Sequence, residues 1–296
     1  MPTVTHVISV PLVPADATAA LALRAALDEM CGADPTLGVT VGPVNEIILW
    51  GQSEPQMDSA VDILKRGKGL DFQCGAPQVQ YRETIAKTLV WDYTHKRQTG
   101  GTGEYANVKI RFQPGEPGSG FVFENAVRGG AIPDAFIPAV EKGLTTAKET
   151  GIIAGFPVVD LKCTLLDGGY HEMDSTEQTF EIAARACFRE ALPQARPRLI
   201  EPMMKVDVAT PLEHLGDVIG DLNSRHGQVT AMDEMDSLFL ITAFVPLANL
   251  FGYINTLSHM THAGAKYAMA FSHYERVPPA RDPDDDNFPP AIGMRA

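Results

Sequence analysis

A group of basic and glycine residues stands out in this sequence because it could bind phosphate. His95, Lys96 and Arg97 are followed by Gln98, and residues 99–103 read Thr-Gly-Gly-Thr-Gly. Glycine lets a backbone lie close to another surface, and lysine and arginine are the usual partners of phosphate. The combination predicts a loop that contacts phosphate, although the same residues also fit an ordinary hairpin tip with solvated charges.

A second glycine-rich turn is predicted at residues 167–171, which read Asp-Gly-Gly-Tyr-His. His171 lies among polar neighbours, which indicates an exposed ring. No nucleophile accompanies it in sequence, so the pattern gives catalysis little support. A neutral imidazole can donate and accept a hydrogen bond and can stack on a base, which suits contact with RNA.

Two nucleotide-binding motifs can be excluded. Residues 101–106 fit the spacing Gly-x-Gly-x-x-Ala of a dinucleotide fingerprint, but that motif requires a following helix. Here Val108, Ile110 and Phe112 alternate with polar residues, which predicts a strand. The sequence also lacks the Gly-Lys-Ser/Thr ending of a nucleotide-triphosphate loop.

Composition narrows the class of protein. A chain of 296 residues with 45% hydrophobic residues favours two or three globular domains. The net charge of −13 argues against overall basic nucleic-acid binding, so any RNA contact must be local. The four cysteines form no Cys-x-x-Cys pair, which indicates reduced, cytosolic thiols without zinc or disulfides. No signal peptide or membrane span is expected.

The first and last parts of the chain share one predicted element order. Strands are expected at residues 3–11, 39–41, 46–50 and 70–74, with an Asp16-capped helix and a second helix containing the apolar positions Met57, Ala60, Val61 and Leu64. Later strands are expected at residues 204–209, 228–232, 238–245 and 266–275. Their helices carry a Thr210–Glu213 capping box with Pro211, and an apolar stripe at Leu247, Leu250, Phe251 and Ile254. Both orders are β-α-β-β-α-β, as in ferredoxin-like sandwiches.

The middle of the chain predicts a different α/β domain. It begins with the glycine hairpin, followed by a helix from Pro138 to about Thr150 and a strand at residues 156–166. Asp174 with Glu177 predicts the cap of a further helix. One apolar face of that helix comprises Phe180, Ala183, Ala184, Cys187, Phe188 and Ala191. Residues 193–202 read as a linker.

The predicted fold class is therefore α+β, with two ferredoxin-like sandwiches flanking a central α/β domain. The predicted domains are residues 1–76, 77–198 and 199–279. Residues 280–296 are acidic and proline-rich, and we expect them to be disordered.

Taken together, these segments resemble the C-terminal domains III, IV and V of elongation factor G, a translational GTPase. Several independent sequence blocks carry the resemblance in the same order. They are residues 75–84 (GAPQVQYRET), 98–105 (QTGGTGEY), 131–143 (AIPDAFIPAVEKG), 167–177 (DGGYHEMDSTE), 201–205 (EPMMK), 216–223 (GDVIGDLN) and 271–275 (FSHYE).

The resemblance implies that the middle domain is an arm reaching the decoding site of the small ribosomal subunit. Its two tip loops would be residues 98–103 and 169–174, and His171 takes the position of the family's tip histidine. The implied partners are the ribosome, through rRNA and the tRNA–mRNA duplex, and the GTPase domain of the same parent protein. The implied contact residues are Lys96, Arg97, Gln98, Thr99, Gly100, Gly101, Thr102, Gly103, Tyr170, His171 and Asp174.

The same resemblance bears on activity and cofactors. GTP and Mg would bind in a GTPase domain that this sequence does not contain, so we expect a non-catalytic, monomeric, cytoplasmic C-terminal piece of a longer protein. The expected role is GTP-dependent translocation of tRNA and mRNA. Thr102 stands where the family usually has arginine, and Ser53 begins a stretch that departs from the family pattern, as in a divergent paralogue. Ribosome recycling or protection therefore remains an alternative, and a small-ligand regulatory module is an alternative of another class.

Overall fold

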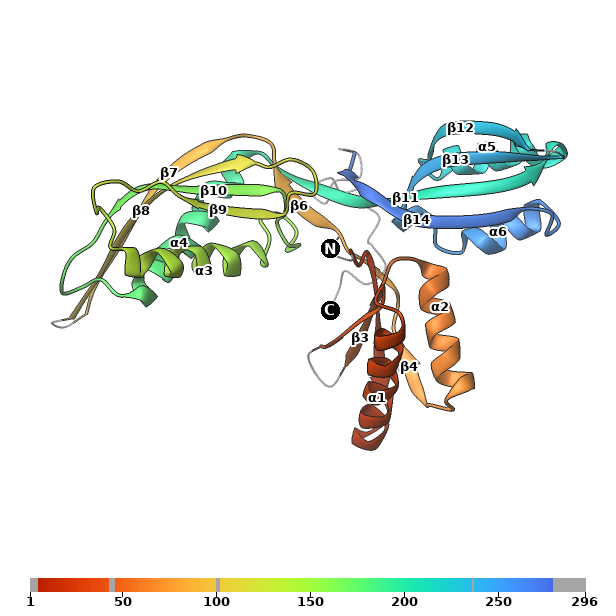
Figure 1. Ribbon diagram of the computed structural model, residues 1–296, viewed down its shortest axis with the longest axis horizontal. Coiled ribbons are helices and arrows are strands. Elements are labelled where there is room, and N and C mark those ends of the chain that lie inside the picture. Colours follow the sequence, from red (N-terminus) through yellow and green to blue (C-terminus); the bar gives the residue numbers. More distant parts are fainter. Residues whose placement is uncertain (1–4, 43–45, 100–101, 236, 279–296) are drawn as a thin grey trace. The chain divides into compact units, whose positions relative to one another are not determined.

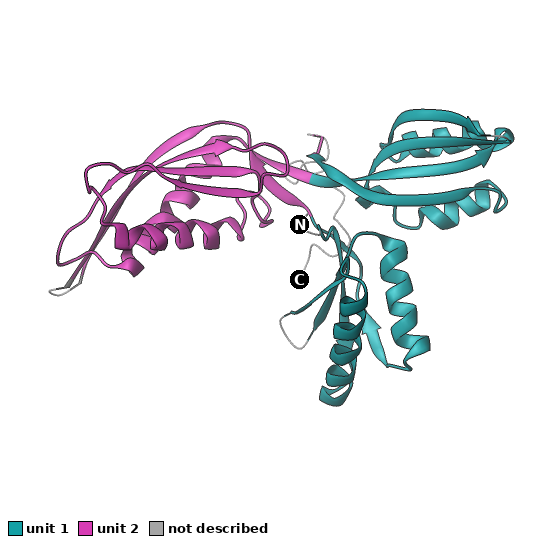
Figure 2. Cartoon of the chain, viewed as in Figure 1, with its two compact units in different colours: residues 1–80, 201–275, 288–296 teal, residues 81–200, 276–287 magenta. Residues whose placement is uncertain are grey.

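The structure is a computed structural model that describes residues 5–42, 46–99, 102–235 and 237–278. The chain divides into two compact units (Figure 2). Unit 1 comprises residues 1–80, 201–275 and 288–296, and unit 2 comprises residues 81–200 and 276–287. The predicted disordered tail and the predicted site residues Gly100 and Gly101 lie outside the described residues.

The first part of unit 1 is a sheet of order β2-β3-β1-β4, with the short strand β5 also paired to β1. Its elements are β1 (Ile8–Pro14), α1 (Ala17–Ala33), β2 (Gly38–Val41), β3 (Ile47–Gly51), α2 (Glu54–Asp62), a π-helical turn (Ile63–Gly67), β4 (Phe72–Cys74) and β5 (Gln78–Val79). Helix α1 begins as predicted, because Asp16 Oδ1 accepts the Ala19 N–H at 2.8 Å.

The second part of unit 1 repeats this arrangement, in the order β12-β13-β11-β14. Its elements are β11 (Pro197–Pro211), α5 (Leu215–Ser224), β12 (Gln228–Met235), β13 (Leu238–Pro246), α6 (Tyr253–Met260) and β14 (Lys266–Arg276). Both parts therefore have the β-α-β-β-α-β order that the periodicity predicted, and the α+β fold class is confirmed.

Three local predictions in this second part were wrong. Thr210 does not cap α5, because β11 continues through it and its hydroxyl is buried without a hydrogen-bond partner among the described residues. A 3₁₀ turn at Leu212–His214 then delays the helix to Leu215. A similar turn before α6 changes which side faces the core, so Ile254 is exposed while Tyr253 and Leu257 are buried.

Unit 2 is built on a four-stranded sheet of order β7-β8-β10-β9, in which β9 is parallel to β10 and the other neighbours are antiparallel. Helices α3 and α4 cover one face of this sheet, and no helix of the described residues covers the other face (Figure 1). The elements are β6 (Arg82–Ile85), β7 (Leu89–Thr99), β8 (Thr102–Pro114), β9 (Phe121–Asn125), α3 (Ile137–Lys148), β10 (Leu161–Gly169) and α4 (Glu177–Ala191).

The core of unit 2 lies between the sheet and its two helices. Val108, Ile110 and Phe112 are fully buried, as their alternation predicted, and so is the whole predicted apolar face of α4. Phe112 meets Phe188 edge to face, with ring centroids 6.1 Å apart. The central strand and α4 thus form one continuous apolar layer.

The segment predicted as a linker, residues 193–202, is instead a 3₁₀ turn followed by the start of β11. Residues Pro197 to Ile200 pair with β6 in an antiparallel ladder. This pairing satisfies backbone groups that a linker would expose to water, and Leu199 and Ile200 are buried as a result. Among the described residues, no helix is long and apolar enough to cross a membrane.

Candidate nucleic-acid interface

The basic segment of the sequence lies at the free end of the β7–β8 hairpin. The ladder continues to the pair Thr99 and Thr102, so Lys96, Arg97 and Gln98 are strand residues rather than loop residues. The alternation of the pleat places Lys96 beside Tyr105 on the open face of the sheet. Arg97 and Glu104, which are opposite each other in the β7–β8 ladder, lie on the opposite face.

The second predicted loop follows β10, but it begins later than the sequence indicated. Strand β10 continues through Gly169, and the turn occupies residues 170–175. Thr176, not Asp174, caps α4, since its hydroxyl accepts the Thr179 N–H at 3.1 Å. The Asp174 side chain is therefore not used to cap α4.

Direct hydrogen bonds join this turn to the hairpin. The Tyr105 N–H donates to the Asp174 carbonyl at 2.9 Å, and the Ser175 hydroxyl donates to the Tyr105 carbonyl at 2.6 Å. The same hydroxyl accepts the His171 N–H at 2.8 Å. Gly103 permits this approach, because a Cβ there would lie 2.7 Å from Cγ of Asp174.

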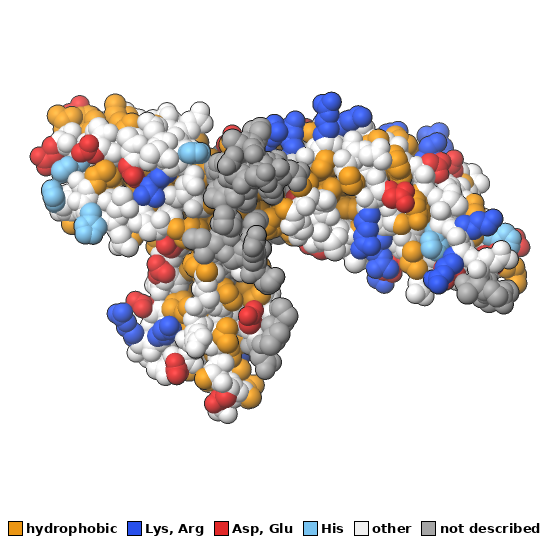
Figure 3. All heavy atoms as spheres, turned by 180° about the vertical axis from the view of Figure 1, so that it is seen from behind, with side chains coloured by type: hydrophobic (Ala, Val, Ile, Leu, Met, Phe, Trp, Pro, Cys, Tyr) orange, Lys and Arg blue, Asp and Glu red, His pale blue; other side chains and the backbone are white. Residues whose placement is uncertain are grey.

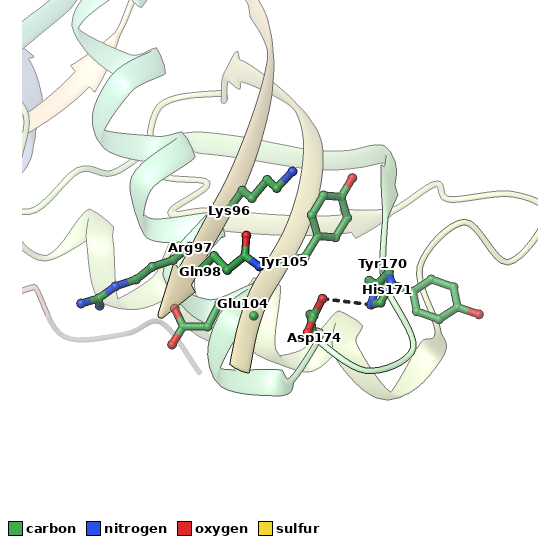
Figure 4. A pocket seen from close by; sticks show the side chains of 9 residues that line it. Lys96, Arg97, Gln98, Glu104, Tyr105, Tyr170, His171 and Asp174 are labelled. Carbon is green, nitrogen blue, oxygen red and sulfur yellow. Dashed lines mark ion pairs between the residues drawn. The ribbon is translucent and has the colours of Figure 1, made fainter. Parts of the chain in front are cut away.

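A cavity of about 600 Å³ opens between the two segments (Figure 4), and we call it the tip cavity. Seven of the predicted contact residues line it. The lining consists of Lys96, Arg97, Gln98, Gly103, Glu104, Tyr105, Tyr170, His171 and Asp174.

Thr99 and Thr102 form the last described pair of the β7–β8 ladder, and Gly100 and Gly101 lie outside the described residues. Two lining residues, Glu104 and Tyr105, were missed. Tyr105 could have been found from the alternation of side chains along a strand, because the ladder pairs it with Lys96 and therefore places both side chains on the same face.

The acidic groups of the tip cavity are bound to histidines. His171 Nδ1 lies 3.1 Å from Asp174 Oδ2, and His95 Nε2 lies 3.1 Å from Glu104 Oε2. His171 Nδ1 also lies 3.4 Å from the Met173 nitrogen. The two His171 contacts are alternatives, because Nδ1 donates to Asp174 only when it carries a proton. The His171 side chain is 59% exposed, as the sequence predicted.

The cations of the tip cavity, in contrast, have no such partners. Among the described residues, the side chains of Lys96 and Arg97 have no hydrogen bond, ion pair or ring contact. Lys162 of β10 differs, since it pairs with Glu124 at 2.9 Å, and this hydrogen bond lowers the pKa of Glu124. The hairpin end therefore presents two cations that form no ion pair among the described residues, beside the carboxylates of Glu104 and Asp174.

Charge is distributed unevenly along the chain. Residues 81–200 contain 14 of the 24 basic residues but only 15 of the 37 acidic residues, and are therefore close to neutral. Figure 3 shows Lys and Arg side chains on the visible face of unit 2. Most of the acidic excess belongs to the rest of the sequence.

The fold and the site define a multidomain α+β protein with two β-α-β-β-α-β parts and an α/β unit that ends in an exposed tip carrying Lys96 and Arg97. Residues 77–196 match the family model "Elongation factor G, domain IV", and residues 198–284 match "Elongation factor G C-terminus". The chain belongs to the elongation factor G family, of which it carries C-terminal domains.

Individual relatives agree with this assignment. The chain is 50% identical over 254 residues to proteins named elongation factor G from two strains of Anaplasma marginale, Florida and St. Maries. The match covers 86% of this chain but only 37% of each relative. A solved structure from Thermus thermophilus superposes with a TM-score of 0.73 at 34% identity, over 94% of this chain and 42% of that one.

The family implies GTP and Mg, but the residues present do not fit such a site. The sequence contains no Gly-Lys-Ser/Thr phosphate loop. Within the described ranges, no three His, Cys, Asp or Glu side chains are grouped so as to hold a metal ion. No nucleotide step is therefore assigned to this chain.

Proposed function

We propose that this chain is the ribosome-binding C-terminal part of an elongation factor G-like translation factor. In this proposal residues 77–198 are the arm, and residues 1–76 and 199–279 are the parts that relay the state of a GTPase domain. The observation that supports it most directly is the exposed tip, in which two segments about 70 residues apart meet beside Lys96 and Arg97, whose side chains are unpaired within the described part of the chain. The partners would be rRNA and the tRNA–mRNA duplex.

The geometry suits an arm that bears load. Strand β7 has 11 residues and β8 has 13, so the hairpin extends for roughly 35 Å at about 3.3 Å per residue. Helix α4 packs on both strands, and we expect this packing to stiffen the hairpin. Lys96 and Arg97 would contact phosphates, and the exposed His171 ring would contact a base or ribose. In a cytoplasmic, monomeric parent, movement of the GTPase domain would be transmitted to this tip.

Ribosome pelleting at several salt concentrations tests the proposal. We expect salt-sensitive binding that falls about tenfold or more in the triple variant Lys96→Ala, Arg97→Ala, His171→Ala, because phosphate contacts are lost. A matched control is Lys87→Ala with Arg189→Ala. Both residues are exposed and lie away from the tip cavity. Lys87 is hydrogen-bonded to Ala195 through its backbone, and Arg189 lies near the C-terminal end of α4. Equal binding by the triple variant and this control would refute the site assignment.

Translocation is the role that we propose for the parent, and ribosome recycling or protection is the alternative. These roles require different assays of the same chain. Adding a separately produced GTPase domain should restore movement of mRNA on the ribosome if translocation is correct. Splitting of ribosomal subunits without mRNA movement would instead support recycling.

A small-ligand regulatory module is the alternative from another class. Unit 1 contains a cavity of about 240 Å³ lined by Glu54, Asp58 and Tyr267 among others. Burial raises the pKa of both carboxyl groups. The volume is below the roughly 300–1,000 Å³ of typical ligand pockets, so ribosome binding is the better supported function. A thermal shift with a metabolite, and no pelleting with ribosomes, would favour the small-ligand module over ribosome binding.

A further inference from the structure

The tip cavity has the size and the lining of a site for one nucleotide. Its volume of about 600 Å³ is within the roughly 300–1,000 Å³ range of small-molecule pockets. We propose that it receives a single unstacked ribonucleotide of an RNA strand, with the phosphate at Lys96 and the ribose or base edge at Asp174. This inference rests on the proposed function and specifies the ligand of the same site.

The charges of the tip cavity determine the orientation of the nucleotide. Lys96 on the hairpin is unpaired among the described residues. The two carboxylates of the lining are Glu104, on the opposite face of the hairpin from Lys96, and Asp174 on the other segment. A phosphate is attracted by Lys96 and repelled by Asp174. Among the described residues, the ion pair of Asp174 with His171 uses Oδ2, so Oδ1 can accept a hydrogen bond from a ribose hydroxyl or a base N–H.

The aromatic residues of the tip cavity supply the surface for the base. Tyr105 comes from β8 and Tyr170 from the turn after β10, so two tyrosines line the cavity from different elements, and the Tyr170 ring extends outward from it (Figure 4). Tyr170 is 41% exposed, which leaves a ring available for contact. Proteins hold unpaired RNA bases by stacking on such rings. Inorganic phosphate would use neither the rings nor Asp174.

The hydroxyl of the sugar distinguishes RNA from DNA at such a site. A carboxylate accepts a hydrogen bond from a 2′-hydroxyl, and a deoxyribose offers none at that position. We therefore expect ribonucleotides to bind better than deoxyribonucleotides. The expected difference is roughly threefold or more, corresponding to the loss of one hydrogen bond.

The experiment is a titration of the ¹⁵N-labelled full chain into the millimolar range with three probes: adenosine 5′-monophosphate, its 2′-deoxy analogue and inorganic phosphate. We expect the ribonucleotide to shift amide signals of residues 96–98, 103–105 and 170–175. Lys96→Ala and Asp174→Asn should each weaken binding about fivefold or more. Lys266→Ala is the control, because Lys266 is also an exposed strand lysine without a partner among the described residues.

Several outcomes would overturn the inference. Equal shifts with inorganic phosphate would indicate an anion site only, and equal affinity for the deoxy analogue would remove the role of Asp174 toward ribose. Absence of shifts with all probes would reject the nucleotide site. Ribosome pelleting of the same samples distinguishes failure of the nucleotide site from failure of the proposed function. If the unmodified chain pellets with ribosomes, the proposed function stands whatever the titration shows. If it does not pellet, the proposed function is rejected.

Discussion

At the scale of single residues, the tip depends on a close contact between Gly103 and Asp174. The space next to the Gly103 Cα is occupied by the carboxyl group of Asp174, whose Oδ1 and Cγ both lie 2.7 Å from the position of a Cβ. Gly103 does not have a positive φ, so alanine is acceptable to the backbone itself. A methyl group there would act only by displacing Asp174.

We predict that Gly103→Ala weakens ribosome binding and nucleotide binding about fivefold, because Asp174 moves away from His171. The melting temperature of the protein should change little, since the side chains concerned are partly exposed. Gly216→Ala is the control, because a Cβ at Gly216 meets nothing within 4 Å. Unchanged binding by Gly103→Ala would show that the position of Asp174 is unimportant.

Asp34 illustrates a residue whose effect depends on pH. It follows α1, and its carboxylate accepts the Thr36 N–H at 2.9 Å, the Thr36 hydroxyl at 2.5 Å and the Gln56 side-chain N–H at 3.1 Å. The hydrogen bond from the Thr36 hydroxyl is the main cause of a lowered pKa of Asp34. The carboxylate thereby connects α1 to α2.

A lowered pKa means that the folded protein favours the ionised form of Asp34. Its contribution to stability is therefore present above the unfolded pKa, near 3.9, and is lost as the pH falls through the lower folded value. We predict that Asp34→Asn is less stable than the unmodified protein at pH 7 and that the difference shrinks toward pH 2. Urea unfolding at several pH values measures this, and a constant difference would contradict it.

At the scale of elements, Glu83 organises the connection between α3 and β10. The side chain is fully buried in β6, and its carboxylate accepts four backbone N–H groups, from Ile152, Ile153, Ala154 and Phe156. A loop without regular structure thus obtains its hydrogen bonds from one side chain. The neighbouring Val158 then bridges to the same strand.

Removal of this carboxylate should destabilise unit 2. We predict that Glu83→Ala lowers the free energy of unfolding by about 3 kcal/mol or more, because buried N–H groups lose their acceptor. Glu83→Gln should be intermediate, since its amide retains one acceptor oxygen. Trp91 fluorescence during urea unfolding, in a Trp50→Phe background, reports on unit 2. Glu141→Ala, an exposed change on α3, is the control, and an equal effect there would contradict the argument.

The elements themselves were largely predictable from local patterns. The period of two in β8 and the apolar stripe of α4 each describe a surface that must be buried, and both are buried. The ends of elements were less predictable. Asp174 and Thr176 are both good caps by residue type, and the choice between them depends on whether β10 continues to Gly169.

At the scale of the whole molecule, charge and fold have separate consequences. The net charge of −13 disfavours nonspecific binding of RNA, while the nearly neutral residues 81–200 present Lys96 and Arg97 at the hairpin end. The proposed binding to the ribosome would therefore depend on a few local contacts. This is why single substitutions at the tip are expected to have measurable effects.

The sequence by itself determined the α+β class, the repeated β-α-β-β-α-β order and the family, because periodic burial and characteristic residue blocks are readable along the chain. Only the tertiary structure decided that Gly103 meets Asp174, that Tyr105 joins the wall of the tip cavity, and that residues 197–200 form a strand. Each of these facts depends on contacts between residues about 70 or more positions apart. Local patterns restrict which face is buried, but they do not specify which distant segment covers it.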